Sequence, residues 1–213
     1  MSQFVGLMYH NVCASAELET PDAAFARLSP SIRSYFVTTE QFESHLKAIG
    51  STRWLHPKEL GGERPGATTP RVLLTFDDGW AGSFDQTAPL LAKFGAQAIV
   101  FVTTGLIGHS LFASESTLRN APAAQFEIGA HTVTHPFLSE RDSSLIRQEL
   151  VDSRSDLEDI LGRPVRSMSV PERIARRSRS PDRTGSGLFA ALHIRCSREY
   201  FDVRKRIRAA CRP

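Results

Sequence analysis

The sequence has few cysteines, no long apolar run and no basic leader, and each of these absences excludes a class of protein. Its three cysteines, Cys13, Cys196 and Cys211, are odd in number and lack the spacing of a metal site. We therefore expect no disulfide framework and a reducing compartment. No apolar run approaches the ~18 residues of a membrane span, and the N-terminus lacks the basic and apolar segments of a secretory signal. These features favour a cytoplasmic protein without a membrane span.

The composition divides the chain into two unequal parts. Of the 213 residues, 41% are apolar and 23% are charged, an ordinary balance for a globular protein with a sizeable core. Residues 1–170 hold 14 Lys and Arg against 19 Asp and Glu, whereas residues 171–213 hold 12 against 4. We therefore predict one folded domain over residues 1–171 and an atypical, Arg-rich tail over residues 172–213.

Strands and helices alternate along the predicted domain. Short apolar runs predict buried strands at residues 4–9, 71–76, 97–103, 126–130 and 165–170. Apolar residues at helical spacing, each series stopped by a glycine, predict helices near residues 38–49, 88–94 and 142–161. Residues 13–37 show no clear period and predict a long loop. This order predicts an α/β fold with a mostly parallel sheet, whose functional groups lie at the carboxyl ends of the strands.

Two adjacent carboxylates, Asp77 and Asp78, directly follow the clearest predicted strand at residues 71–76. Such a pair is costly at the end of a buried strand unless a cation neutralises it. Neighbouring side chains of an extended segment point to different sides, so one Asp can face a metal while the other faces a substrate or an Arg. An Asp-Gly turn with a helix cap explains the same residues, so the pair alone leaves both interpretations open.

Two histidines, His131 and His135, follow the predicted strand at residues 126–130. Their His-x3-His spacing separates the imidazoles by about one helical turn, so they can share one ion. A pair of ordinary surface or core histidines is the alternative. Two imidazoles and one carboxylate form an open catalytic ligand set for zinc or a similar divalent ion, with a fourth position left for water.

Together, the segments TFDDG (residues 75–79) and HTVTH (residues 131–135) resemble the polysaccharide deacetylase family, metal-dependent carbohydrate esterases with a NodB-like domain. The segments LMYHNV (residues 7–12) and FVTTEQFESHL (residues 36–46) resemble one branch of it. For His10 in the first of these, a role in the site and a purely structural role are both open. The resemblance implies a distorted (β/α) barrel that is incomplete at its C-terminus.

The resemblance also implies a role for each matching residue. Asp78, His131 and His135 would bind a divalent metal, above all Zn²⁺, and Asp77 would be the general base. Arg166 would pair with Asp77 and orient it, although an ordinary surface Arg is the alternative. The implied reaction removes acetyl groups from N-acetylated sugars or polysaccharides. The expected partner is thus an acetylated oligo- or polysaccharide, and not a nucleic acid.

The resemblance ends at Pro171. In the family, a late Leu-x-His segment provides the general acid that protonates the leaving group. The nearest counterpart here is His193, within an apolar run at residues 188–194 that could form a closing strand. The residues between Pro171 and this run are polar, rich in Arg, and typical of disorder.

Three interpretations of the tail at residues 172–213 stay open. An altered reading frame or a truncation can have replaced the last part of the domain. The tail can instead be a basic extension that binds an anionic polymer, or a helix at residues 200–211 that docks on the domain. Because the general acid and part of the substrate groove would be lost in the first case, the alternative function is a catalytically impaired sugar- or metal-binding remnant.

Overall fold

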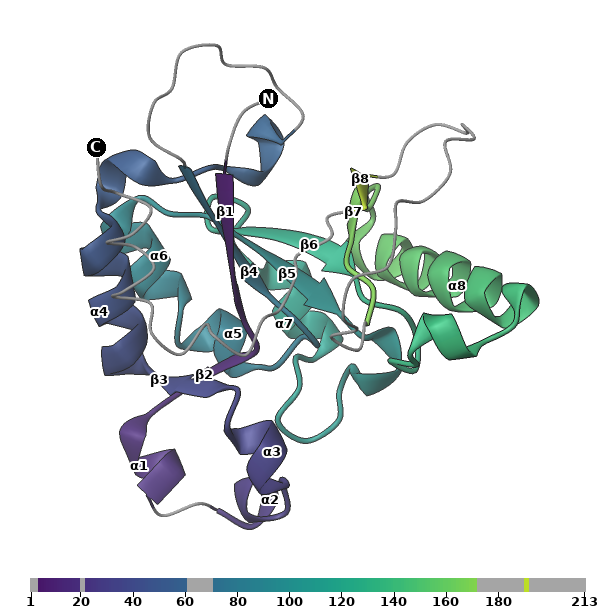
Figure 1. Cartoon of the computed structure of the whole chain (residues 1–213), viewed down its shortest axis with the longest axis horizontal. Coiled ribbons are helices and arrows are strands. Elements are labelled where there is room, and N and C mark those ends of the chain that lie inside the picture. Colours follow the sequence, from purple (N-terminus) through teal and green to yellow (C-terminus); the bar gives the residue numbers. More distant parts are fainter. Residues whose placement is uncertain (1–3, 20–21, 61–70, 172–189, 192–213) are drawn as a thin grey trace.

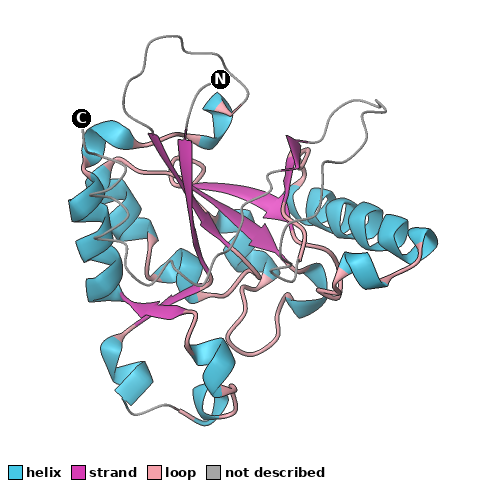
Figure 2. Ribbon diagram, in the orientation of Figure 1, coloured by secondary structure: helices cyan, strands magenta, loops and turns pink. Residues whose placement is uncertain are grey.

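The main sheet is parallel and curved. The structure, a computed structural model, describes residues 4–19, 22–60, 71–171 and 190–191. Six strands in this part pair in the order β1-β4-β5-β6-β7-β8, and every pair is parallel. Their bounds are Phe4–Tyr9 (β1), Arg71–Phe76 (β4), Ala98–Val102 (β5), Phe126–Ala130 (β6), Ser167–Met168 (β7) and Ala190–Ala191 (β8). Figure 2 shows helices outside this sheet. Sheet and helices together form an incomplete and distorted (β/α) barrel, and this confirms the predicted fold class.

The three predicted helices are also confirmed. They are α4 (Thr39–Ile49), α6 (Ala88–Phe94) and α8 (Ser143–Leu161). Thr38 caps α4 and Asp142 caps α8, because their side chains accept hydrogen bonds from backbone N–H groups of the first turn. In Figure 1, α4 and α6 lie on the side of β1 and β4, whereas α8 lies beside β6 and β7. Shorter helices and 3₁₀ turns occupy Gly82–Asp85 (α5), Glu115–Asn120 (α7), Ser51–Arg53, Pro57–Glu59, Thr104–Leu106 and Leu138–Glu140.

The prediction of a long loop over residues 13–37 is wrong. This part contains short elements, drawn at the bottom of Figure 1: β2 (Asn11–Cys13), α1 (Ser15–Glu19), α2 (Ala23–Ala26), α3 (Pro30–Arg33) and β3 (Phe36–Thr38). Each helix has only four or five residues, too few for a helical period to emerge in the sequence. Phe25 and Phe36 anchor the segment to Trp80 in a separate apolar cluster.

The far edge of the sheet is shorter than predicted. β7 contains only two residues, instead of the predicted strand at residues 165–170. Residues 190–191 pair in parallel with β7, and they belong to the run at residues 188–194 that was expected to close the sheet. His193 and the rest of the tail after residue 191 lie outside the described residues.

The register of the strands brings several chain segments to one edge of the sheet. Tyr9 at the end of β1 pairs with Phe76 at the end of β4. The hydrogen bonding continues past the strand ends, since the N–H of Asp77 donates to the carbonyl of Tyr9 and the N–H of His131 to that of Val102, both at 2.9 Å. The residues that directly follow β1, β4 and β6 therefore meet at the carboxyl edge.

A single large apolar cluster fixes this arrangement. All five residues of β5 are buried, and each long helix contributes a fully buried side chain, Phe42 from α4, Leu91 from α6 and Leu157 from α8. Burial of one such side chain stabilises a fold by about 1.5–3 kcal/mol. None of the described helices combines the length and the apolar character that crossing a bilayer would require.

Candidate active site and metal centre

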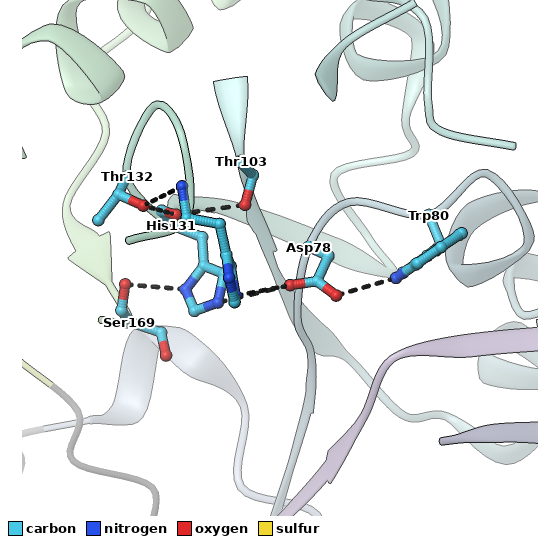
Figure 3. Close-up of polar contacts among 7 residues, drawn as sticks. Asp78, Trp80, Thr103, His131, Thr132 and Ser169 are labelled. Atoms are coloured by element: carbon cyan, nitrogen blue, oxygen red, sulfur yellow. Dashed lines mark hydrogen bonds and ion pairs between the residues drawn. The ribbon is translucent and has the colours of Figure 1, made fainter. Parts of the chain in front are cut away.

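The turn after β4 holds Asp78 in an uncommon backbone conformation. Asp78 has a φ of 73° and Gly79 a φ of 83°, in the left-handed region that residues other than glycine rarely adopt. A Cβ atom at position 79 would lie 3.0 Å from Cγ1 of Val102, so the turn requires glycine. The carboxylate of Asp78 points toward the end of β6, and its Oδ2 accepts a hydrogen bond of 3.1 Å from Nε1 of Trp80 (Figure 3).

The two predicted histidines meet at the other oxygen of this carboxylate. Oδ1 of Asp78 lies 3.2 Å from Nε2 of His135 and 3.6 Å from Nε2 of His131. One ligand atom from each of the three residues falls within 4.8 Å of the other two. His131 is 2% exposed and His135 is 39% exposed, so the site is closed on one side and accessible to solvent on the other.

The imidazole of His131 is held in one tautomer and is uncharged. Its Nδ1 lies 2.9 Å from the carbonyl oxygen of Ser169. Because a carbonyl can only accept, Nδ1 carries the proton and the lone pair of Nε2 faces Asp78. Burial lowers the pKa of His131 to about 4, although the charge of Asp78 opposes this shift. The imidazole is therefore uncharged near neutral pH.

Asp78 supplies the negative charge of this cluster of three side chains. Burial raises its pKa, but His135, His10 and His131 outweigh this effect and hold the pKa of Asp78 below its ordinary value. Its Oδ1 is buried and makes no hydrogen bond of standard geometry within the described residues. A buried carboxylate oxygen without a donor, facing two imidazole nitrogens, fits a divalent cation such as Zn²⁺.

The neighbouring carboxyl group of Asp77 has a different environment. Burial raises the pKa of Asp77 from 3.8 to about 7, helped by the charge of Asp78 and opposed by His10 and His135. The side chain is only 8% exposed. Its Oδ1 has no hydrogen-bond partner among the described residues. Such a carboxylate readily accepts a proton near neutral pH.

His10 faces this carboxylate pair from the end of β1. Its charge acts on both Asp77 and Asp78. Its half-buried ring stacks on Tyr35, with ring centroids 4.7 Å apart. The segment LMYHNV and the place of His10 after the predicted strand at residues 4–9 were its signals in the sequence, and they left the role of His10 open. Figure 1 explains the proximity, since β1 lies next to β4 in the sheet.

Arg166 is not brought to the carboxylates. The residue is exposed and precedes β7. Within the described part of the chain, no hydrogen bond or ion pair joins Arg166 to Asp77, and Asp77 senses the charge of His10 instead. The pairing expected from the sequence is therefore not formed in this structure. The backbone carbonyl of Ser169, three residues later, is what this segment contributes to the site.

The sequence analysis predicted no role for Glu149 of α8. Glu149 is buried, and it accepts hydrogen bonds from the segment between the two histidines. The helix was predicted from its apolar positions, and Glu149 lies on the same face as Ser153 and Leu157, which are also buried. A carboxylate on the buried face of a helix is the signal that could have revealed it.

Comparisons with known proteins identify the family and the fold of the chain. Residues 65–179 match the family model described as polysaccharide deacetylase. A curated relative is YxkH of Bacillus subtilis (strain 168), which is named provisionally as a polysaccharide deacetylase. It is 25% identical over 178 residues, which cover 78% of this chain and 55% of the relative. The chain thus spans about half the length of that relative.

Two solved structures share the fold. The Streptococcus pyogenes deacetylase PplD in complex with acetate has a TM-score of 0.63 and 23% identity, and the match covers 79% of this chain and 74% of that one. IcaB from Ammonifex degensii has a TM-score of 0.62 and 22% identity, with 80% and 75% covered. At this level of identity the likeness establishes the architecture of the sheet and its helices.

Proposed function

The chain belongs to the polysaccharide deacetylase family, and on this premise we propose that it is a metal-dependent hydrolase that removes acetyl groups from N-acetylated sugars or polysaccharides. The observation that carries the proposal is the convergence of Asp78, His131 and His135 within 4.8 Å, next to the buried carboxyl group of Asp77. Family membership supports the substrate class, and the ligand set supports the metal.

The three converging residues would hold the ion, for which we propose Zn²⁺. Two neutral imidazoles and one carboxylate are characteristic ligands of catalytic zinc. A bound ion of this kind supplies Lewis acidity toward an acetyl carbonyl and makes water easier to deprotonate. Asp78 is the anionic ligand, and the Ser169 carbonyl keeps Nε2 of His131 free for the ion.

Asp77 acts as the general base in this proposal. Its carboxylate takes a proton from water as the water oxygen attacks the carbonyl carbon of the acetamide. Burial favours this transfer, because it makes the carboxylate a stronger base than an exposed Asp. The reaction then requires a proton on the sugar nitrogen when the carbon–nitrogen bond breaks, which releases acetate and a free amine.

His10 is the candidate for the donor of that proton. Three described groups have charges that act on Asp77, namely His10, Asp78 and His135. Asp78 and His135 are proposed metal ligands, which leaves His10 for this role. His10 follows β1 and stacks on the exposed ring of Tyr35, so we propose that the substrate binds on this side of the carboxylates. His10 would thereby take the role that the family resemblance assigned to a late histidine, for which His193 was the nearest counterpart.

Acetate release from N-acetylated oligosaccharides tests the proposal. The zinc-loaded protein is compared with Asp77→Asn, a variant that retains all three metal ligands. We expect acetate from the wild type, and at least a 100-fold lower rate from the variant at equal zinc content. Equal rates in the two proteins would contradict a role for Asp77.

A non-catalytic sugar- or metal-binding remnant is the second candidate. It is favoured by the position of Arg166, which leaves Asp77 without the partner expected from the family. In that case both proteins bind zinc and neither releases acetate. The same assay therefore separates the enzyme from the remnant.

A further inference from the structure

The segment between the two histidines is not held by regular structure of its own. Four non-glycine residues in the described part of the chain have positive φ, and two of them, Thr132 (67°) and His135 (56°), lie here. Residues other than glycine rarely adopt such conformations, which persist only where the surroundings enforce them. Contacts from outside the segment must therefore hold the two imidazoles in place.

Glu149 of α8 provides the strongest of these contacts. Its Oε2 accepts hydrogen bonds from the N–H groups of Val133 at 2.7 Å and Thr134 at 2.9 Å, and its Oε1 accepts one from Oγ1 of Thr134 at 2.5 Å. The residue is 4% exposed. These three donors compensate its buried charge, and the charge of Arg141 also favours the ionised carboxylate.

The opposite side of the segment is fixed by the turn after β5. The N–H of Thr104 donates to the carbonyl of Thr132 at 3.1 Å, and the N–H of Gly105 to that of Val133 at 2.9 Å. Oγ1 of Thr104 also donates to Oδ2 of Asp156, one of the exposed residues of α8, at 2.8 Å. The histidine segment is thus bonded on one side to α8 and on the other to a turn that α8 itself holds.

We infer that Glu149 is a positioning residue for the metal ligands. Its carboxylate fixes the backbone at Val133 and Thr134, and this sets where His131 and His135 place their Nε2 atoms relative to Asp78. The inference rests on the proposed function in one respect, namely that these three residues bind a divalent ion. Metal affinity should therefore depend on a side chain that does not contact the metal.

A substitution on the same helix provides a matched control. Glu158 also accepts a backbone hydrogen bond, from the N–H of Val165 at 2.9 Å, and a second bond from Nε of Arg154 at 2.8 Å. It makes no contact with the histidine segment. Glu149→Gln and Glu158→Gln each replace a carboxylate of α8 by an amide of the same size, so any general effect on the helix is shared.

The experiment is a zinc titration of wild type and variants against a competing chelator at one pH. We expect Glu149→Gln to weaken zinc binding by about 10–100-fold, the effect typical of residues that orient metal ligands. Glu158→Gln should bind zinc as the wild type does. Hydrogen exchange of the metal-free proteins should show faster exchange at Val133 and Thr134 in Glu149→Gln alone.

A milder variant covers the case in which Glu149→Gln does not fold. Thr134→Val removes only the hydroxyl bond to Oε1, and we expect a several-fold loss of zinc affinity. Wild-type affinity in a folded Glu149→Gln, or in Thr134→Val if the former does not fold, would overturn the inference while the proposed function stands. Zinc binding that depends on Glu149 without any acetate release would support the inference and contradict the proposed function. A wild type that binds no zinc would overturn both.

Discussion

Asp77 and Asp78 are neighbours in the chain, yet their surroundings shift their pKa values in opposite directions. Asp77 is buried and Asp78 is half-buried. Asp78 faces His131 and His135 directly, whereas burial dominates the environment of Asp77. The carboxyl group of Asp78 thus stays ionised, and that of Asp77 titrates near neutrality. In the proposed mechanism, one dipeptide thereby supplies both a metal ligand and a proton acceptor.

The raised pKa of Asp77 predicts a stability effect in the metal-free protein. An acid with a pKa near 7 when folded and 3.8 when unfolded binds its proton more tightly in the folded state. It therefore lowers the free energy of unfolding increasingly as the pH rises from about 4 to 7. Asp77→Asn removes this penalty, so the variant should gain stability over wild type, by on the order of 2 kcal/mol more at pH 8 than at pH 5.

Urea unfolding in the presence of a chelator at the two pH values measures this difference. Asp152→Asn is a suitable control, because it removes a carboxylate from the exposed face of α8. The control should show no comparable change between the two pH values. A stability gain of Asp77→Asn that is equal at pH 5 and pH 8 would argue against a raised pKa of Asp77.

We predict opposite effects on the rate of acetate release for substitutions of His10 and Arg166. If His10 donates the proton to the leaving nitrogen, His10→Asn should lower the rate of acetate release by about 100-fold or more and leave zinc affinity nearly intact. Arg166→Ala should stay within a few-fold of wild type, because the side chain is exposed and has no contact with Asp77 in the described residues. A large loss of rate in Arg166→Ala, with little loss in His10→Asn, would instead support the pairing of Arg166 with Asp77 that the sequence predicts.

At the scale of elements, the sequence was most informative where segments are long or buried on both faces. β1, β4 and β6 coincide with the predicted strands, and α4 and α8 begin within one residue of the predicted helix starts. The short helices between β2 and β3 were missed, since their stability comes from caps and from packing against Trp80 rather than from a periodic apolar face. β7 was predicted too long.

Substitution of Gly79, in the turn between β4 and α5, should cost more stability than the same substitution of Gly95, which follows α6. Gly79 and Gly95 both have positive φ, but a Cβ atom on Gly79 would lie 3.0 Å from Val102, whereas one on Gly95 would have no neighbour within 4 Å. Gly95→Ala should cost about 1 kcal/mol of stability from backbone strain alone. Gly79→Ala should cost clearly more, and it should also weaken zinc binding because Asp78 precedes it.

Denaturant unfolding and zinc titration of both variants test this prediction. A folded Gly79→Ala with wild-type zinc affinity would mean that the turn does not position Asp78. Equal stability losses in the two variants would mean that the contact with Val102 relaxes at no cost.

At the scale of the whole molecule, the site exists because parallel strands end at one edge. Asp78 and His131 are far apart in the sequence, yet they follow β4 and β6, on either side of β5. The ligand types and the strand ends could be predicted from the sequence. The sequence left the role of His10 open. It did not predict the contributions of Ser169 and Glu149, because they depend on which strand lies next to which and on where α8 packs.

Metal removal links the site to global stability. A ligand that binds only the folded state adds about 2.7 kcal/mol when its concentration is 100 times its Kd. We expect a chelator to lower the melting temperature of wild type measured with excess zinc, and to leave that of an Asp78→Ala, His131→Ala double variant unchanged. Scanning calorimetry of both proteins with and without chelator measures this. Equal effects of zinc on the two proteins would place the ion elsewhere.

The most direct test of this account is the zinc content of the purified full-length protein, determined by elemental analysis beside the Asp78→Ala, His131→Ala double variant. The account predicts stoichiometric zinc in the wild type and none in the double variant. A wild type that takes up no zinc, or a double variant that retains it, would contradict the assignment of Asp78, His131 and His135 as the metal centre.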